Sequence, residues 1–457
     1  MRRGLWISVV ALGVFTCVAV FVIVSIWAPW SPVADGQLKS DVEEYQGATY
    51  VEPPKPQSGL TPDSPTLMDQ GTAPTADDVA SAWALMSAAA GEGKWQAWGY
   101  VADADTGEVL LDAGADALHT PASTAKLFAT KAALDHLPKD RTLRTGTSIA
   151  GNTLHLWGEG DLLLTAEKGK PGSTSGRAGL ADLAEKTAQS LAAAGTSEVA
   201  LTYQDTLFEG PKRHPSWAKQ EVQDYAGDLG PFAINTGRTE PGAWSFVEDS
   251  SFEVAAAFSE ALKAQGVAVT SVEAGKAPEG GEDVAEVESA TVHDQLTFML
   301  YHSDNTMADQ YCKLAALEAG APTTFEGSTK LAVEAVGAAG IDTSTMSLDD
   351  CSGLSTSNQV TPKQLAQVLQ ADKDIIRMLP RAGLSGTLGD RFSGEIMIGN
   401  VQAKSGSLGI VSSLAGVLTS QSGRNLVFAV GTDKVPEQGA YWTRGYIDDF
   451  LDTIAGY

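Results

Sequence analysis

A serine and a lysine stand three positions apart in the segment PASTAKLFAT, where a turn-forming proline leads into apolar residues at helical spacing. On a helix, positions i and i+3 lie on one face, so the Ser123 hydroxyl and the Lys126 amine are expected to be neighbours. A lysine can act as a base when burial or a nearby cation lowers its pKa. The segment therefore predicts a helix from Ser123 to about Leu137 that delivers a base to a nucleophile.

The Ser-x-x-Lys spacing alone is weak, because helix starts favour serine and exposed helical faces favour lysine. The chain holds a second copy, Ser216 and Lys219 in SWAK. This copy is followed by QEVQDYAG, which is too polar to bury the lysine. We therefore assign the second copy to chance.

Two triplets elsewhere in the chain strengthen the case for the Ser123-x-x-Lys126 motif. Ser303-Asp304-Asn305 is the only Ser-x-Asn of the chain, and Lys404-Ser405-Gly406 is the only Lys-[Ser/Thr]-Gly. Taken singly, the former is equally well explained as a helix N-cap and the latter as an edge strand protected by a charge. Together, in this order and in helix, helix-entry and strand contexts, they predict one catalytic site.

Several other classes of protein are excluded. The chain has no Gly-x-Ser-x-Gly elbow and no His-Glu-x-x-His helix, so a Ser-His-Asp enzyme and a zinc hydrolase are unsupported. Acids outnumber bases 57 to 31 and the formal charge is −26, which argues against a nucleic-acid surface. The chemistry needs no metal and no organic cofactor.

The rest of the chain predicts an α+β core interrupted by an insertion. A helix is expected from about Asp77, followed by a β-hairpin over 95–114. Residues 141–290 mix short β-like runs with helical pieces at 178–194 and 252–265. Helical spacing resumes over 293–320, strands follow at 399–408, 411–420 and 425–433, and a helix closes the chain at 440–455.

The N-terminal region predicts export. Residues 4–28 are 25 uncharged residues preceded by Arg2 and Arg3, which is long enough for a membrane anchor, with a cleaved signal peptide as the alternative. Eight of the 20 prolines then fall between Pro29 and Thr75. We expect an anchor at 1–28 and an extended, acidic spacer at 29–76.

The three triplets, with the phrases TPASTAKL, GEGD, DCSGLSTSNQVTP and LPRAGLSGTLGDRF, resemble the D-alanyl-D-alanine carboxypeptidase/endopeptidase family, the class C low-molecular-mass penicillin-binding proteins. The resemblance covers about residues 77–457. It implies a transpeptidase core of the penicillin-binding-protein/β-lactamase type, an antiparallel sheet flanked by helices, built from 77–140 and 291–457. Residues 141–290 would then form an inserted mixed α/β subdomain, shorter than is usual in the family.

The resemblance also implies a role for each residue. Ser123 attacks the penultimate D-alanine, Lys126 takes its proton, and an acyl-enzyme forms, which penicillin would trap. Ser303 relays a proton to the leaving group, and Asn305 holds Lys126 and the substrate. The third triplet is expected to bind the substrate. Lys404 and Ser405, a serine where the family commonly has threonine, face the terminal carboxylate of the substrate. Gly406 precedes Ser407, whose backbone N–H, together with that of Ser123, is expected to bind the oxyanion formed during the reaction.

Three other positions carry weaker expectations. Asp161 is expected to bind an amino group of the peptide side chain, or else to be a turn residue beside Gly160, and the proline customary after it is missing. Cys312 and Cys351 are either a disulfide that braces the second triplet or two buried thiols. Asp309 stands where the family often has glutamate.

The predicted function is a serine D-Ala-D-Ala carboxypeptidase/endopeptidase that acts on peptidoglycan stem peptides outside the cytoplasm, tethered by its N-terminal helix or secreted. The alternatives are a β-lactamase or serine esterase on the same fold, and a non-catalytic β-lactam-binding domain. The long insertion and the absence of an identifiable deacylation glutamate disfavour the β-lactamase.

Overall fold

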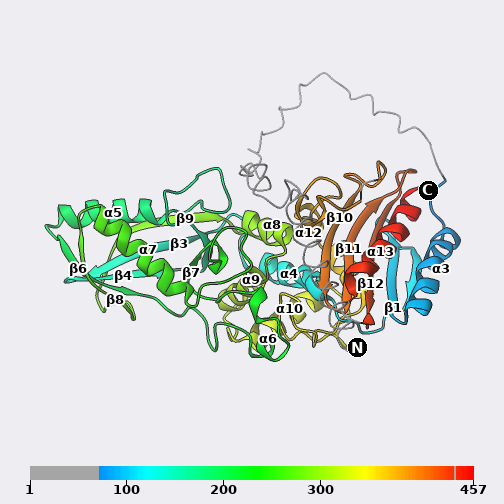
Figure 1. Cartoon of the computed structure of the whole chain (residues 1–457), viewed down its shortest axis with the longest axis horizontal. Helices are drawn as coiled ribbons and strands as arrows, with labels where there is room; N and C mark the ends of the chain where they lie inside the picture. The colour runs from blue at the N-terminus through cyan, green and yellow to red at the C-terminus, as the bar shows by residue number, and fades with distance from the viewer. Residues whose placement is uncertain (1–71, 393, 437–438) are drawn as a thin grey trace, which may run out of the picture. The chain divides into compact units, whose positions relative to one another are not determined.

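The structure is a computed structural model that describes residues 72–392, 394–436 and 439–457 (Figure 1). The predicted anchor at 1–28 and the spacer up to residue 71 lie outside the described residues. Among the helices of the described part, none combines the length and the apolar character needed to cross a membrane. The described residues all fall within one compact unit.

The first helix among the described residues is α3 (Ala76–Gly93), which begins close to the predicted start. Thr75 caps this helix: its hydroxyl accepts the N–H of Asp78, and the Asp78 carboxylate accepts the N–H of Thr75. This reciprocal pair is a capping box, which satisfies two N–H groups at the helix start. Asp78, one of the two aspartates that suggested a helix start in the sequence, therefore stabilises that start through this hydrogen-bond pattern.

The first sheet has five antiparallel strands and contains the predicted hairpin and all three predicted late strands. Alternate residues face opposite sides of a strand, so this sheet needs an apolar cover on both faces. Along β12, Phe428 and Val430 pack with α3 and α13, whereas Val427 and Ala429 face the helices of the other side. In sheet order the strands are β10 (Val401–Leu408), β11 (Val411–Thr419), β12 (Asn425–Asp433), β1 (Gln96–Asp103) and β2 (Val109–Ala113).

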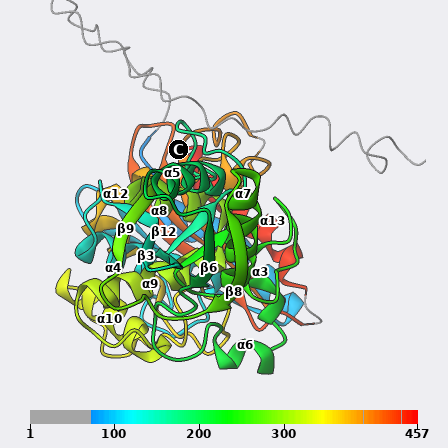
Figure 2. The same cartoon turned by 90° about the vertical axis from the view of Figure 1, so that its left-hand side faces the viewer.

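A second five-stranded sheet is built from residues 142–291 and mixes parallel with antiparallel pairs. Figure 2 shows its helices α5 (Leu180–Ala193) and α7 (Ser250–Ala264), which pack against the sheet through one apolar cluster. The strands are β8 (Ala268–Ala274), β6 (Glu198–Tyr203), β4 (Thr153–Gly158), β3 (Thr142–Ala150) and β9 (Glu282–Thr291), and a separate pair is β5 (Asp161–Leu164) with β7 (Phe232–Ile234).

Two of the remaining helices carry the predicted catalytic residues Lys126 and Asn305. The α+β class expected from the sequence is confirmed, with an antiparallel sheet covered by helices on both faces. The remaining helices are α4 (Lys126–His136), α6 (Pro215–Lys219), α8 (Val292–His302), α9 (Asn305–Glu318), α10 (Phe325–Ala338), α11 (Pro362–Ala371), α12 (Lys373–Arg377) and α13 (Ala440–Ala455). Short 3₁₀ turns lie at Ala122–Ala125, Gln223–Tyr225, Asn235–Gly237 and Gly386–Leu388.

Candidate active site

The helix predicted from Ser123 to about Leu137 is present, but its first turn, which brings Ser123 and Lys126 together, is a 3₁₀ turn rather than an α-helical one. The turn spans Ala122–Ala125, and α4 begins only at Lys126, whose backbone N–H donates to the carbonyls of Ser123 and Thr124. A 3₁₀ helix has three residues per turn, so side chains at i and i+3 eclipse each other. The turn therefore aligns the two side chains more closely than an α-helix would.

The Lys126 amine is buried and sits at the centre of a hydrogen-bond cluster. Its Nζ lies 2.9 Å from the Ser123 Oγ, 2.7 Å from the Asn305 Oδ1 and 2.6 Å from the carbonyl oxygen of Ser352. Burial disfavours the charged form and lowers the pKa of Lys126 to about 8, although the carboxylates of Asp309, Asp350 and Asp304 oppose the shift. A larger fraction of Lys126 is therefore in the neutral form, with a free lone pair, near neutral pH than for an ordinary lysine.

The second triplet lies at the entry to helix α9, as expected, but the helical spacing over 293–320 belongs to two helices with a break at this triplet. Helix α8 ends at His302, and Ser303 follows in the left-handed conformation with φ of 54°. Asp304 caps α9 by accepting the N–H of Met307 at 2.9 Å. Asn305 is the first residue of α9, and its Nδ2 donates to the Tyr225 carbonyl, which leaves its Oδ1 for Lys126.

The third triplet lies on β10, the edge strand of the first sheet. The buried Lys404 donates from its Nζ to the Ser303 Oγ at 2.8 Å and to the Ser405 carbonyl at 2.7 Å. Burial and the neighbouring Lys126 hold its pKa well below the ordinary value. A Cβ on Gly406 would lie 3.1 Å from the Ser123 nitrogen, so glycine permits the strand to approach the nucleophile.

These residues border a pocket of about 850 Å³. Of the predicted residues, Ser123, Ser303, Asn305, Ser405 and Ser407 line it. Lys126 and Lys404 lie buried behind them, each bonded to a lining serine.

Sequence reasoning missed several residues of this pocket. Arg391 and Arg444 add positive charge, and Arg444 donates to the Ser407 hydroxyl at 2.5 Å. On other elements, Tyr225 and Trp244 contribute exposed aromatic rings. None of these four residues belongs to one of the three motifs. Arg391 lies in the phrase LPRAGLSGTLGDRF, but only the folded chain shows that it and the other three line the pocket.

The structure does not bring Asp161 to the pocket. This residue is 1% exposed, begins β5 directly after Gly160, and accepts the N–H of Leu163 at 2.9 Å. Burial raises its pKa to about 7. A carboxyl buried within a strand pair cannot reach a substrate amine, so the position agrees with the alternative of a local backbone role.

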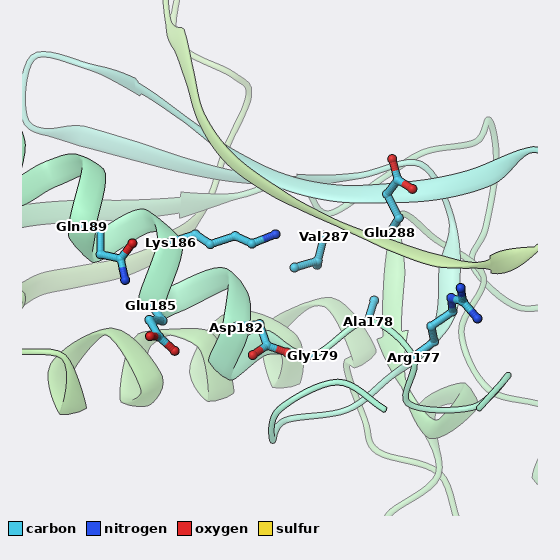
Figure 3. A pocket seen from close by; sticks show the side chains of 9 residues that line it. All are labelled: Arg177, Ala178, Gly179, Asp182, Glu185, Lys186, Gln189, Val287 and Glu288. Carbon is cyan, nitrogen blue, oxygen red and sulfur yellow. The ribbon is translucent and has the colours of Figure 1, made fainter. Parts of the chain in front are cut away.

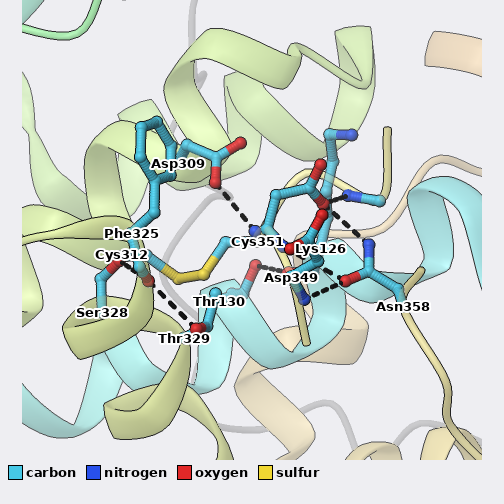
Figure 4. Close-up of a disulfide and its surroundings, with 12 residues drawn as sticks. Lys126, Thr130, Asp309, Cys312, Phe325, Ser328, Thr329, Asp349, Cys351 and Asn358 are labelled. Carbon is cyan, nitrogen blue, oxygen red and sulfur yellow. Dashed lines mark hydrogen bonds between the residues drawn. A yellow bond between two sulfur atoms is a disulfide. The ribbon is translucent and has the colours of Figure 1, made fainter. Parts of the chain in front are cut away.

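A disulfide joins Cys312 of α9 to Cys351. Figure 4 shows it beside Asp309 and Lys126, with the Cys351 N–H donating to the Asp309 Oδ1 at 2.8 Å. The bridge therefore connects the helix of the second triplet to the segment whose Ser352 carbonyl contacts Lys126.

A second pocket, of about 390 Å³, lies between α5 and β9 and shares no residue with the first. Figure 3 shows Lys186 of α5 reaching toward Val287 of β9, with charged side chains of both signs around it. Lys186 donates to the Glu286 carbonyl at 2.9 Å, so its amine already has a structural partner.

Within 72–392, 394–436 and 439–457, no group of three or more His, Cys, Asp or Glu side chains is placed to hold a metal ion.

Comparison with known proteins gives a consistent result. The chain matches the D-Ala-D-Ala carboxypeptidase 3 (S13) family over residues 84–245 and 233–453. Carboxypeptidase DacB of Mycolicibacterium smegmatis is 32% identical, covering 85% of this chain and 87% of that protein. A carboxypeptidase of Mycobacterium tuberculosis is also 32% identical, with 85% and 86% covered. Penicillin binding protein 4 of Haemophilus influenzae shares the fold, with a TM-score of 0.69 at 20% identity over 82% of this chain and 99% of that one.

Proposed function

Because the chain belongs to the D-Ala-D-Ala carboxypeptidase 3 (S13) family, it is a serine-type D-Ala-D-Ala carboxypeptidase, and we propose that Ser123 is its nucleophile and Lys126 its base. The observation that carries this assignment is the 2.9 Å contact between the Lys126 Nζ and the Ser123 Oγ inside a buried cluster. A serine needs a base at this distance to react at neutral pH.

The other partners of Lys126 support the direction of proton transfer. A neutral amine has two N–H groups and one lone pair. The Asn305 Oδ1 and the Ser352 carbonyl oxygen can only accept, so they occupy both N–H groups. The lone pair is then left for the Ser123 hydroxyl, which donates its proton to it.

Catalysis then proceeds in two steps. The Ser123 Oγ bonds to the carbonyl carbon of the penultimate D-alanine as its proton passes to Lys126, and the bond to the terminal D-alanine breaks. Ser303, held by Lys404 at 2.8 Å, relays a proton to the departing amine. Water next hydrolyses the acyl-enzyme and restores the Ser123 hydroxyl. An amine from a cross-linked peptide leaves in the same way, which gives endopeptidase activity.

Substrate recognition uses the pocket on either side of Ser123. We assign the oxyanion to the backbone N–H groups of Ser123 and Ser407, because the close approach of Gly406 brings β10 beside the nucleophile. The terminal carboxylate binds near Lys404 and Ser405, where Arg391 and Arg444 add positive charge. β-Lactams enter the same site and acylate Ser123.

The enzyme acts on the cell wall, outside the cytoplasm. We further propose that residues 4–28 tether it to the membrane, which the length of this uncharged stretch supports. We also retain the division into a core of 77–140 with 291–457 and an insertion at 141–290, since the second sheet is built from 142–291.

Labelling with a fluorescent penicillin tests the assignment. The full chain should form a stable covalent adduct that is lost in Ser123→Ala. The matched control is Ser216→Ala, which removes the serine of the second Ser-x-x-Lys copy and should leave labelling intact. Labelling that persists in Ser123→Ala, or rapid turnover of the penicillin, would contradict the proposal. Digestion of isolated muropeptides then distinguishes exo- from endo-cleavage.

A further inference from the structure

One peptide group links Lys126 to a buried aspartate that carries none of the proposed catalytic roles. The carbonyl oxygen of Ser352 accepts from the Lys126 Nζ at 2.6 Å, and the N–H of the same peptide unit, on Gly353, donates to the Asp350 Oδ1 at 2.8 Å. In a trans peptide the C=O and N–H point in opposite directions. The peptide therefore lies between the carboxylate and the lysine.

Asp350 is itself held by four donors. It is fully buried, and its Oδ1 also accepts from the Asn358 Nδ2, while its Oδ2 accepts from the Ser355 N–H and the Trp217 Nε1, each at 2.8 Å. Hydrogen bonds to an ionised acceptor are shorter and stronger than neutral ones. This carboxylate is therefore a fixed anchor for the turn that follows it.

Helix α9 holds the same turn from a second direction. Asn305, Asp309 and Cys312 follow one another at i, i+4 and i+7, so they lie on one face of the helix. Asp309 accepts the Cys351 N–H and Cys312 forms the disulfide with Cys351 (Figure 4). The face that presents Asn305 to Lys126 thus also fixes the residue before Ser352.

The turn reaches the nucleophile as well as the base. Gly353 has φ of 83°, and a Cβ on it would lie 1.8 Å from the Ala122 carbonyl oxygen and 3.0 Å from the Ser123 nitrogen. Only glycine allows this approach. The segment 350–353 is therefore in contact with both members of the Ser123-Lys126 pair.

We propose that Asp350 and Asp309 are positioning residues for Lys126: they fix the turn 351–353 so that the Ser352 carbonyl aims the lysine lone pair at Ser123. This inference rests on the proposed role of Lys126 as the base. Asp350 acts through the Ser352–Gly353 peptide, and Asp309 acts through the Cys351 N–H.

The same two residues have an electrostatic effect that a merely structural role would lack. The charged groups that face Lys126 are Asp309 and Asp304 of α9 and its cap, Asp350 of the turn, and Lys404 of β10. The negative charge of either carboxylate opposes the effect of burial on the pKa of Lys126. Removing one of these charges should lower the pKa of Lys126, so the rise of the acylation rate with pH should begin at a lower pH.

The test compares Asp350→Asn with Asp349→Asn, using the rate of acylation by a fluorescent penicillin as a function of pH. Asp349 is the matched control because its Oδ2 accepts from Ser216 and Ser355 rather than from the turn 351–353. In Asp350→Asn the part of the profile that rises with pH, the acid limb, should move down by about one pH unit. The plateau rate should fall about tenfold or more, because only one oxygen remains for four donors and the new amide nitrogen faces two of them. Asp349→Asn should leave the limb in place.

Asp309→Asn keeps the inference testable if Asp350→Asn does not fold. Asparagine retains an oxygen for the Cys351 N–H, so the limb should move down while the plateau stays within about threefold of the wild type. An unshifted limb in the folded variants overturns the inference, provided that labelling still depends on Ser123. Labelling that survives Ser123→Ala instead refutes the proposed function itself, so the two failures are distinguishable.

Discussion

The pH dependence of acylation is the most direct test of the proposed base. Burial lowers the pKa of Lys126 from 10.5 to about 8, a shift that corresponds to about 3.4 kcal/mol between the two protonation states. At pH 7 about one molecule in 11 then carries the neutral amine, compared with about one in 3,000 for an ordinary lysine. Burial therefore increases the reactive fraction about 300-fold.

The assay measures the pseudo-first-order rate of labelling by a fluorescent penicillin between pH 6.5 and 10. The rate should rise about tenfold per pH unit below the pKa and level off above about pH 8.5, because the base must be unprotonated. His302 also lines the pocket, but desolvation lowers its pKa from 6.5. Burial and the neighbouring Asp350 raise the pKa of Asp309 to about 7, so the slope of the rate is read above pH 7, where this carboxyl is ionised. A rate that still climbs tenfold per unit at pH 10 would refute the lowered pKa. A flat profile would refute a lysine base.

Two further predictions concern residues around the site. Gly353→Ala should reduce the rate of acylation about a hundredfold or more, because the new Cβ would lie 1.8 Å from the Ala122 carbonyl oxygen. The control is Gly340→Ala, because Gly340 has the same φ of 83° but open space around it, and this variant should leave the rate unchanged. Equal effects of the two substitutions would argue against a specific contact at Gly353. Asp161→Asn should leave labelling intact and change stability: the pKa of Asp161 is raised from 3.8 to about 7, so the folded state binds more protons and the wild type loses up to about 4 kcal/mol as the pH rises through this window. Urea unfolding at pH 4 and 8 should show a correspondingly smaller loss in the variant, and an unchanged loss would contradict the burial argument.

Local sequence patterns predicted much of the secondary structure correctly. The hairpin, the three late strands and the closing helix fall where alternation and helical spacing indicated, because the period of the apolar residues along each segment is a local property of the sequence. The structure differs from the predicted helices at two junctions, the first turn before α4 and the break between α8 and α9. The 3₁₀ turn at Ser123 and the helix break at Ser303 depend on backbone conformation, with φ of 54° at Ser303, which the apolar pattern does not encode.

The sequence by itself determined the chemistry that this protein carries: serine hydroxyls, two amines and an amide in three motifs whose order and residue types identify a serine peptidase. Only the tertiary structure decided how these groups behave. The pKa of Lys126 is lowered because the amine is buried against residues that are 179 and 226 positions away. Asp350 is linked to that lysine through a peptide group, and Asp161 is buried in a strand pair. Arg391 and Arg444 reach the pocket from outside the three motifs. Desolvation and long-range approach are properties of the packed chain, and no local pattern specifies them.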